Sequence, residues 1–434
     1  MLDSNDPLIA LADTINWETF DESFEKYYHE DGRPAKPIRL MVGLLILKQL
    51  KDLSDEEMVI QWKQNPYFQY FCGFNEFQVA LPCHPTDLVY FRKRIGTEGV
   101  GQIFSMSVSL HGKKAEEKQV IIDTTVHEKN VTYPTDGKLA IKMIHQLLRI
   151  AKEEQIQLRR TYMKEIKMHR ISLRFFRHPK KIKKARAAMK RLKTIVGILI
   201  RDISRNLTEE QLSKHQETFD LFTKVTKQQM KDSNKVYSLH ESHIYAIAKG
   251  KDHKKYEYGT KASLVTTMKS NVIIGIVAHE KNEHDSKTLE AALASASKHR
   301  TKPIVEAICD RGYRGKKEVN GTGICIPDSP KKRDTKYQKE QKRKKFRRRA
   351  AIEPIIGHVK SDHRMQRNYL KGFVGDEINL LLAATAFNLK KWMNLFFLLI
   401  FMLNIALILR GLAHIRRNQR EKYADLYLML FRLW

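Results

Sequence analysis

Two apolar runs that lead into an aspartate constrain the fold of this chain more than any other feature. The first, KQVIIDTTV, contains Asp123, and the second, PIVEAICD, ends at Asp310. Short apolar runs with β-branched residues, followed by polar turn residues, are typical of strands buried in a sheet. We therefore predict two buried strands of one sheet, each with a carboxylate at its C-terminal edge.

Further strand signals stand between these two runs. KYEYGTKASLVTT and NVIIGIVAH are separated by the turn residues 269–271, which predicts an antiparallel hairpin. The next segment, DSKTLEAALASASKH, predicts a helix capped by Asp285 or Ser286, and GICIP predicts a short strand after Asp310. This order of strands and helix predicts an α/β core, a mixed sheet flanked by helices.

Changes in composition divide the 434 residues into four predicted regions. The N-terminal region has helical apolar spacing and a capping box in which Ser54 precedes Glu57, so we expect an all-helical domain for DNA binding or dimerisation. The predicted regions are the N-terminal domain (1–115), the catalytic core (116–139 and 236–393), a basic helical insertion (140–235) and an apolar then basic tail (394–434).

The charge of the chain predicts a polyanionic partner. Lys and Arg number 79 against 49 Asp and Glu, a formal charge of +30. Nucleic acid is the leading candidate because basic residues release counterions from phosphates, although a membrane surface or an acidic protein has the right sign too. Residues 141–200 hold 18 Lys and Arg against three Glu, and residues 331–349 hold 12 against two acidic residues. In the insertion we expect DNA contacts from Lys180, Lys181, Lys183 and Lys184, with a solvated helix surface as the alternative.

Cysteine usage and the two ends of the sequence predict a cytoplasmic protein. The four cysteines form no CxxC pair, and the first residues lack the pattern of a signal peptide. Residues 395–409 are an apolar run of 15 residues interrupted by Asn404, shorter than the roughly 20 that span a bilayer. We interpret the run as a buried core helix, with a membrane-associated helix or a non-functional extension as alternatives. A membrane partner is therefore not expected.

Carboxylates on strand ends suit metal-dependent phosphoryl transfer, because paired divalent cations prefer hard oxygen ligands. Glu353 lies in a predicted helix, and separations of 3, 4 and 7 residues along Phe346, Arg349, Glu353 and Lys360 place the four on one face. Arg and Lys on that face would bind DNA phosphates while Glu353 binds metal. An ordinary ion pair between Arg349 and Glu353 is the alternative.

Other polar residues near the predicted site have two interpretations each. Asp285 is a fourth carboxylate of the site or, more simply, a helix N-cap. Histidines near the site are expected to be structural, because magnesium sites prefer oxygen; they are His127, His279 and His284. Lysines around the start of the hairpin either contact DNA or protect an edge strand; they are Lys249, Lys251, Lys254, Lys255 and Lys261.

Four motifs occur in a fixed order: IIDTTVHEKN, HEKNEHDSKTLE, CDRGYRG and RRRAAIEPIIGHVKSDHRM. In this order they resemble the bacterial insertion-sequence transposases of the IS4 and IS5 type, and the N-terminal GRPAKPIRLMVGLLILKQL resembles the helical domain of the IS5 type. The family pairs its Glu with an Arg four residues before, a Lys seven after and a Tyr seven before. Glu353, Arg349 and Lys360 match this pattern, whereas Phe346 stands at the Tyr position. The resemblance covers roughly residues 15–393.

The resemblance implies an RNase H-like core and a DDE transposase, an enzyme that cleaves and joins DNA strands. Asp123, Asp310 and Glu353 would be its catalytic residues and the ligands of Mg²⁺ or Mn²⁺, with two ions expected. Water attack at the ends of the mobile element would free 3′ hydroxyls, which then attack target DNA.

The same resemblance implies the partners. Arg349 and Lys360 would contact phosphates near the cut, and Tyr313, in the turn after Asp310, would stack on a base or fill the core. Double-stranded DNA, as terminal inverted repeats and as target, is the expected partner, and a homodimer on DNA is the expected assembly. No small-molecule substrate is expected, and the location is cytoplasmic at the nucleoid.

Three other functions fit parts of the sequence. A catalytically silent DNA-binding descendant of a transposase would not need Asp123, Asp310 and Glu353. An RNase H-like nuclease would hydrolyse DNA without joining it. A basic RNA-binding protein gives no reason for carboxylates at the ends of two apolar strands.

Overall fold

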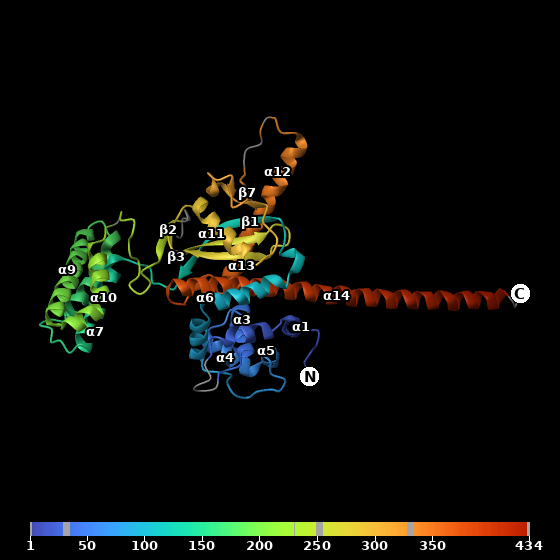
Figure 1. Ribbon diagram of the computed structural model, residues 1–434, viewed down its shortest axis with the longest axis horizontal. Helices are drawn as coiled ribbons and strands as arrows, with labels where there is room; N and C mark the ends of the chain where they lie inside the picture. The colour runs from blue at the N-terminus through green and yellow to red at the C-terminus, as the bar shows by residue number, and fades with distance from the viewer. Residues whose placement is uncertain are drawn as a thin grey trace.

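A computed structural model describes residues 2–28, 35–229, 231–248, 255–327, 331 and 333–431, the side chains of 403, 404 and 406–431 excepted. Within these residues the chain forms a mixed sheet flanked by helices, an N-terminal group of helices and a separate helical bundle (Figure 1). The predicted α/β architecture with an all-helical N-terminal region is confirmed.

The N-terminal region consists of short helices around apolar α3. Ser54 caps α4 by accepting from the backbone N–H of Glu57, whose carboxylate accepts from the backbone N–H of Ser54, so the predicted capping box is confirmed. The helices are α1 (Pro7–Thr14), α2 (Glu18–Glu25), α3 (Ile38–Leu50), α4 (Asp55–Gln64), α5 (Pro66–Phe71), α6 (Pro85–Ser109) and the 3₁₀ turn η1 (Gly112–Lys114).

The sheet is built around β1, which lies antiparallel to β3 and parallel to β5. Its path is β2-β3-β1-β5-β7-β6, with β4 also paired to β3 and β8 to β1. The predicted hairpin is confirmed as the antiparallel pair β3 and β4. The strands are β1 (Gln119–Lys129), β2 (Tyr245–Ala248), β3 (Tyr256–Thr267), β4 (Ile273–His279), β5 (Glu306–Ile308), β6 (Glu318–Val319), β7 (Thr322–Cys325) and β8 (Arg367–Asn368).

Asp123 does not stand at the C-terminal edge of its strand, so that prediction is wrong. It is the fifth of the eleven residues of β1. The strand continues because β3 keeps pairing with it as far as Glu128, opposite Gly259. The parallel neighbour β5 stops much earlier, with Ile308 opposite Ile121. At Asp123, β1 is therefore still paired with β3 on one side but no longer with β5 on the other.

Helices from distant parts of the chain adjoin the sheet. They are α11 (Asp285–Ser297), α12 (Lys336–Arg349), α13 (Ile352–Asp362) and α14 (Gly372–Phe431), with the 3₁₀ turn η3 (Arg311–Tyr313) after β5. Gly275 on β4 lets α11 approach closely, because a Cβ there would lie 2.7 Å from the backbone nitrogen of Ala296. The first part of α14 and α6 lie between the sheet and the N-terminal helices, and all share one hydrophobic core (Figure 1).

The predicted basic insertion forms helices with a hydrophobic core of their own. They are α7 (Asp136–Glu153), α8 (Met163–Ser172), the 3₁₀ turn η2 (Leu173–Arg177), α9 (Ile182–Asn206) and α10 (Glu209–Lys227). Apolar residues at helical spacing, such as Leu192, Val196 and Leu199 of α9, are fully buried in this second core. Figure 1 shows the bundle standing beside the sheet.

The end of α14 differs from the buried core helix expected for residues 395–409. Phe397, Leu399 and Met402 are 60%, 62% and 59% exposed, although Met393 is still buried. The helix leaves the body of the protein at this point (Figure 1), so these three side chains have no neighbouring element to pack against. No helix among the described residues is long and apolar enough to cross a membrane.

Candidate active site

The carboxylates of Asp123 and Asp310 are brought together by the register of two strands. Ile121 pairs directly with Ile308 across the parallel strands β1 and β5, and each aspartate follows its isoleucine by two residues. Each carboxylate is oriented by a backbone N–H: Thr124 donates to Oδ1 of Asp123 at 2.8 Å, and Gly312 donates to Oδ1 of Asp310 at 2.7 Å. The register therefore places the two aspartates at equivalent positions of neighbouring chain segments.

Tyr313 lies beneath these carboxylates. Its ring is fully buried, and its hydroxyl has no hydrogen-bond partner among the described residues. Burial raises the pKa of this phenol, and the nearby charges of Asp123, Asp285 and Asp310 raise it further. The predicted contact of Tyr313 with a DNA base is wrong in this structure, because the ring fills the core under the site.

Arg349 connects the third carboxylate to the first. Its Nη1 lies 3.8 Å from Oδ2 of Asp123, and its Nη2 lies 3.8 Å from Oε1 of Glu353. The side chain of Glu353 is 67% exposed, whereas that of Asp123 is 17% exposed. The ion pair considered as an alternative for Glu353 thus exists, and the same guanidinium links Glu353 to Asp123.

The single helix predicted through Arg349 and Glu353 is wrong, because the chain forms two helices here. Arg349 is the last residue of α12, and Glu353 is in the first turn of α13. Pro354 has no N–H to donate to the carbonyl of Ala350. The N–H of Glu353 bonds to that carbonyl at 3.2 Å instead, in the tighter i to i−3 pattern.

Asp285 is a member of the site that the sequence assigned more simply to a helix cap. The N-cap of α11 is His284, whose side chain accepts from the N–H of Ser286, so the capping role predicted for Asp285 or Ser286 is wrong. Oδ1 of Asp285 instead accepts from the hydroxyl of Thr124 at 3.1 Å and from Nζ of Lys261 at 3.0 Å.

Thr124 was missed as a site residue, and Lys261 was considered only as a DNA contact or an edge-strand lysine. The sequence signal for the role of Asp285 was the run HDS at the start of a helix. His284 caps the helix there, so the carboxylate of Asp285 is available for other partners. A Cβ on Gly312 would lie 3.0 Å from Oδ1 of Asp310 and 3.1 Å from Oδ2 of Asp285, so this glycine stands between the two carboxylates.

The residues of the site fit divalent metal ions by their chemistry. Asp123, Asp310, Asp285 and Glu353 offer only hard oxygen donors, which Mg²⁺ and Mn²⁺ prefer. Within the described part of the chain, no three His, Cys, Asp or Glu side chains are arranged to hold one ion together. The guanidinium of Arg349 instead compensates the charge between Asp123 and Glu353.

The other residues predicted to bind DNA lie at several places. Lys360 is half-buried in α13, close enough to His127 to affect the pKa of that imidazole. The lysines of the insertion are exposed, far along the chain from the carboxylates; they are Lys180, Lys181, Lys183 and Lys184. Of the hairpin lysines, Lys249, Lys251 and Lys254 lie outside the described residues.

The histidines near the site have hydrogen-bonding roles among the described residues. Nε2 of His127 accepts from the side-chain amide of Asn379 at 2.9 Å, and His279 contacts the hydroxyl of Ser263 at 2.8 Å. Burial lowers the pKa of each imidazole to about 4.

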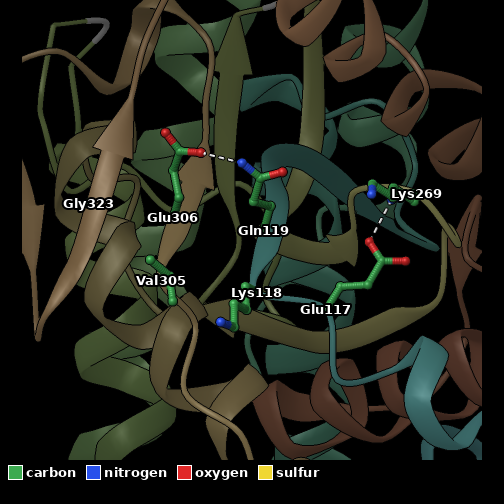
Figure 2. A pocket seen from close by; sticks show the side chains of 7 residues that line it. All are labelled: Glu117, Lys118, Gln119, Lys269, Val305, Glu306 and Gly323. Atoms are coloured by element: carbon green, nitrogen blue, oxygen red, sulfur yellow. Dashed lines mark hydrogen bonds between the residues drawn. The ribbon is translucent and has the colours of Figure 1, made fainter.

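A pocket of about 690 Å³ lies at the opposite ends of β1 and β5 from the carboxylates (Figure 2). Figure 2 shows Glu306 of β5 and Gln119 of β1 pointing toward one another, and their side chains form a 2.8 Å hydrogen bond. This pocket is therefore separate from the carboxylate site.

Comparisons with known proteins bear on the fold and on the class of protein. Residues 1–94 match the family described as a transposase domain (DUF772), and residues 224–389 match the family described as a transposase DDE domain. An uncharacterised protein of Rhizobium meliloti, ORF8 in the nfe locus, is 40% identical over 176 residues, 39% of this chain and 85% of that protein. No solved structure matches the chain. The chain therefore belongs to the insertion-sequence transposases with a DDE domain, and its mixed sheet flanked by helices is consistent with their RNase H-like core.

Proposed function

We propose that this transposase is of the IS4 or IS5 type and that it cuts DNA at terminal inverted repeats and joins the freed ends to target DNA. The observation that supports this function best is the register that sets Asp123 and Asp310 at equivalent positions, with Glu353 linked to Asp123 through Arg349. A protein that only bound DNA would have no use for carboxylates collected beside a buried phenol.

DDE transposase domains generally use divalent metal ions. We propose two ions, Mg²⁺ or Mn²⁺, with Asp123, Asp310 and Glu353 as ligands. When bound, such ions neutralise the charge on the attacking and leaving oxygens of a phosphoryl transfer. The backbone N–H groups of Thr124 and Gly312 fix the rotamers of the two aspartates beforehand, so little side-chain freedom is lost on binding.

The reaction has two displacements at phosphorus. In the first, a water oxygen bonds to phosphorus at the end of the element, and the 3′ oxygen leaves and takes up a proton. In the second, that 3′ hydroxyl oxygen loses its proton and bonds to a target phosphorus, and a 3′ oxygen of the target leaves. Both require the attacking and leaving oxygens to be in line.

Cationic side chains would hold the DNA during these steps. The planar guanidinium of Arg349 suits a phosphate, because its N–H groups match two phosphate oxygens. Its present partners are two carboxylates, so binding a phosphate requires Arg349 to exchange one charge partner for another. Lys360, on α13 with Glu353, is the second proposed phosphate contact.

The proposed partners are double-stranded DNA at the inverted repeats and at the target, and a second copy of the chain, because two ends must be cut and joined. Residues 1–115 are proposed to bind DNA or dimerise, residues 140–235 to extend the DNA surface, and residues 116–139 and 236–393 to carry the chemistry. The proposed location is the cytoplasm, at the nucleoid.

Strand transfer tests the function. The purified chain is incubated with Mg²⁺ or Mn²⁺, a duplex that carries the flanking inverted repeat, and a target plasmid. Joined products with short duplications of the target sequence are expected. Cleaved products without joining would establish a nuclease instead, and metal-independent binding without cleavage would establish a silent descendant. No observation on the described residues favours either alternative.

A further inference from the structure

Helix α12 is unusual because it buries none of its residues. Nine of its 14 residues are Lys or Arg, and Glu340 is its one acidic residue. Like charges three and four residues apart destabilise a helix, and packing of an apolar face supplies most of the stability of protein helices. Figure 1 shows α12 projecting from the sheet. The positive charge of α12 therefore needs anionic or hydrogen-bonding partners, both on the inner face toward the core and on the outer face toward solvent.

The inner face of α12 is satisfied by the protein itself. Lys345 forms an ion pair with Glu306, which also binds Gln119 (Figure 2). Arg348 donates to the carbonyls of Met268 and Lys269 in the turn between β3 and β4, at 2.7 Å each. The last residue, Arg349, reaches Asp123 and Glu353. These contacts hold the helix against the catalytic core.

The outer face of α12 has no such partners from the core, and the one acidic residue on it, Glu340, pairs with Lys344 at 3.0 Å. Lys336, Arg343 and Arg347 are separated by 7 and 4 residues, so at about 100° per residue they lie within roughly 40° of one another. All three are exposed, and none forms an ion pair with a residue that the structure describes. Over 11 residues the three cations span roughly 16 Å along the helix axis.

A row of cations of this length is complementary to the backbone of a DNA duplex, which carries one phosphate per about 1.7 Å of its axis. Single-stranded DNA is bound mainly by stacking on aromatic rings, and a membrane surface requires an apolar face. Tyr337, 69% exposed, is the one exposed large apolar side chain of α12. The chemistry of the outer face therefore favours phosphates of a duplex.

The positive surface continues from α12 toward the sheet. A cleft of about 720 Å³ between α12 and the turn after β3 is lined by further cations, including Lys269, Lys331 and Lys344. Lys269 and Lys331 are exposed. The cleft is also lined by Lys345 and Arg348 of the inner face, so its cations form a second basic surface beside the helix.

We propose that α12 is a docking arm for duplex DNA, whose outer face, Lys336, Arg343 and Arg347, holds backbone phosphates while its last residue stands at the catalytic carboxylates. The proposal rests on the proposed function in that the partner is DNA. It adds a phosphate-binding surface that lies before the catalytic Glu353 in the chain and is fixed to the core by Lys345 and Arg348.

The test measures duplex binding by fluorescence anisotropy in EDTA, at several salt concentrations between about 50 and 200 mM. The variant carries Lys336→Gln, Arg343→Gln and Arg347→Gln, which keep similar helix propensity. Its matched control carries Lys336→Arg, Arg343→Lys and Arg347→Lys, which keep the charge. Circular dichroism and thermal unfolding establish that both are folded.

The Gln variant is expected to lose affinity on the order of 100-fold at about 0.1 M salt, and the slope of log affinity against log salt is expected to fall by about 2.7. The charge-retaining control is expected to bind like the wild type. Equal affinity and equal slope for the Gln variant would overturn the docking arm while leaving the proposed function intact. A wild-type chain that binds no duplex would overturn both, and tighter binding to phosphatidylglycerol vesicles than to the duplex would assign the face to a membrane.

Discussion

Asp123 and Asp310 each stand two residues beyond Ile121 and Ile308, which pair directly across the parallel strands β1 and β5. Side chains two residues apart in a strand return to the same face, so one register positions both carboxylates. The two residues are 187 positions apart in the chain, the same offset as every pair between β1 and β5. The proposed active site of this transposase thus depends on the pairing of a strand of only three residues.

Gly312→Ala is expected to impair cleavage by about 10-fold, because the new Cβ would push against Oδ1 of Asp310 and Oδ2 of Asp285 and small displacements of catalytic groups are costly. Gly357→Ala in α13 is the matched control, since a Cβ there meets nothing within 4 Å. Cleavage rates and urea unfolding of the two variants are compared. Wild-type cleavage by Gly312→Ala would show that the two carboxylates need no close spacing.

Tyr313→Phe is expected to leave the free energy of unfolding unchanged or to raise it by about 1 kcal/mol, because it removes a buried hydroxyl without a described partner. DNA binding is expected to stay at the wild-type level, since the ring is fully buried. Urea unfolding and anisotropy measure the two effects. Weaker duplex binding by a folded variant would show that Tyr313 contacts DNA despite the burial of its ring.

Acidification is expected to destabilise the fold through His127. Burial lowers the pKa of this imidazole from 6.5 to about 4, outweighing the attraction of Asp376. Between these values the unfolded chain binds a proton that the folded chain does not, so stability rises with pH across this window and is lost as pH falls.

The contribution of His127 has a slope of at most about 1.4 kcal/mol per pH unit. Urea unfolding between about pH 4 and 6.5 measures it, and His127→Gln is expected to remove it. His279 and His299, whose burial also lowers the pKa to about 4, keep their own contributions in this variant. An unchanged slope in His127→Gln would show that this imidazole is not buried in its neutral form.

Replacing the four exposed lysines of the insertion by Gln is expected to weaken DNA binding and to lower the salt slope by about 0.9 for each phosphate that the protein no longer neutralises. Replacing them by Arg keeps the charge and is the control. Anisotropy at several salt concentrations compares the two variants. If both bind like the wild type, this stretch is only a solvated surface; the residues changed are Lys180, Lys181, Lys183 and Lys184.

The sequence predicts the parts of the fold that depend on local pattern. The two apolar runs and the hairpin are short-range signals, and the structure contains each of them. The extent of β1 beyond Asp123 depends on pairing with β3, which no local pattern reveals. The exposure of Phe397 likewise depends on whether another element lies beside the helix, not on its own composition.

Two features were misread from the sequence, the break between α12 and α13 and the role of Asp285. In each case a simpler interpretation of the same residues was available. Pro354 lies in the first turn of α13, where proline is tolerated. It therefore indicated that a new helix begins here, although the spacing of the residues around it predicted one continuous helix. A carboxylate at the beginning of a helix is most simply a cap. The partners of Asp285 are Thr124 and Lys261, which lie on two strands that only the folded sheet brings together.

We infer that Asp123, Asp310 and Glu353 form one metal-dependent cleavage site. The most direct measurement incubates a labelled duplex bearing the inverted repeat with Mg²⁺, Mn²⁺ or EDTA, using the wild type and the variants Asp310→Asn, Glu353→Gln and, as an exposed control on α11, Glu290→Gln. Cleavage is expected at the repeat end with metal only, lowered by about 1,000-fold or more in the two site variants and unchanged in the control, while duplex binding persists in all. Cleavage by Glu353→Gln or Asp310→Asn at the wild-type rate, or cleavage in EDTA, would show that these residues do not form a metal-dependent cleavage site.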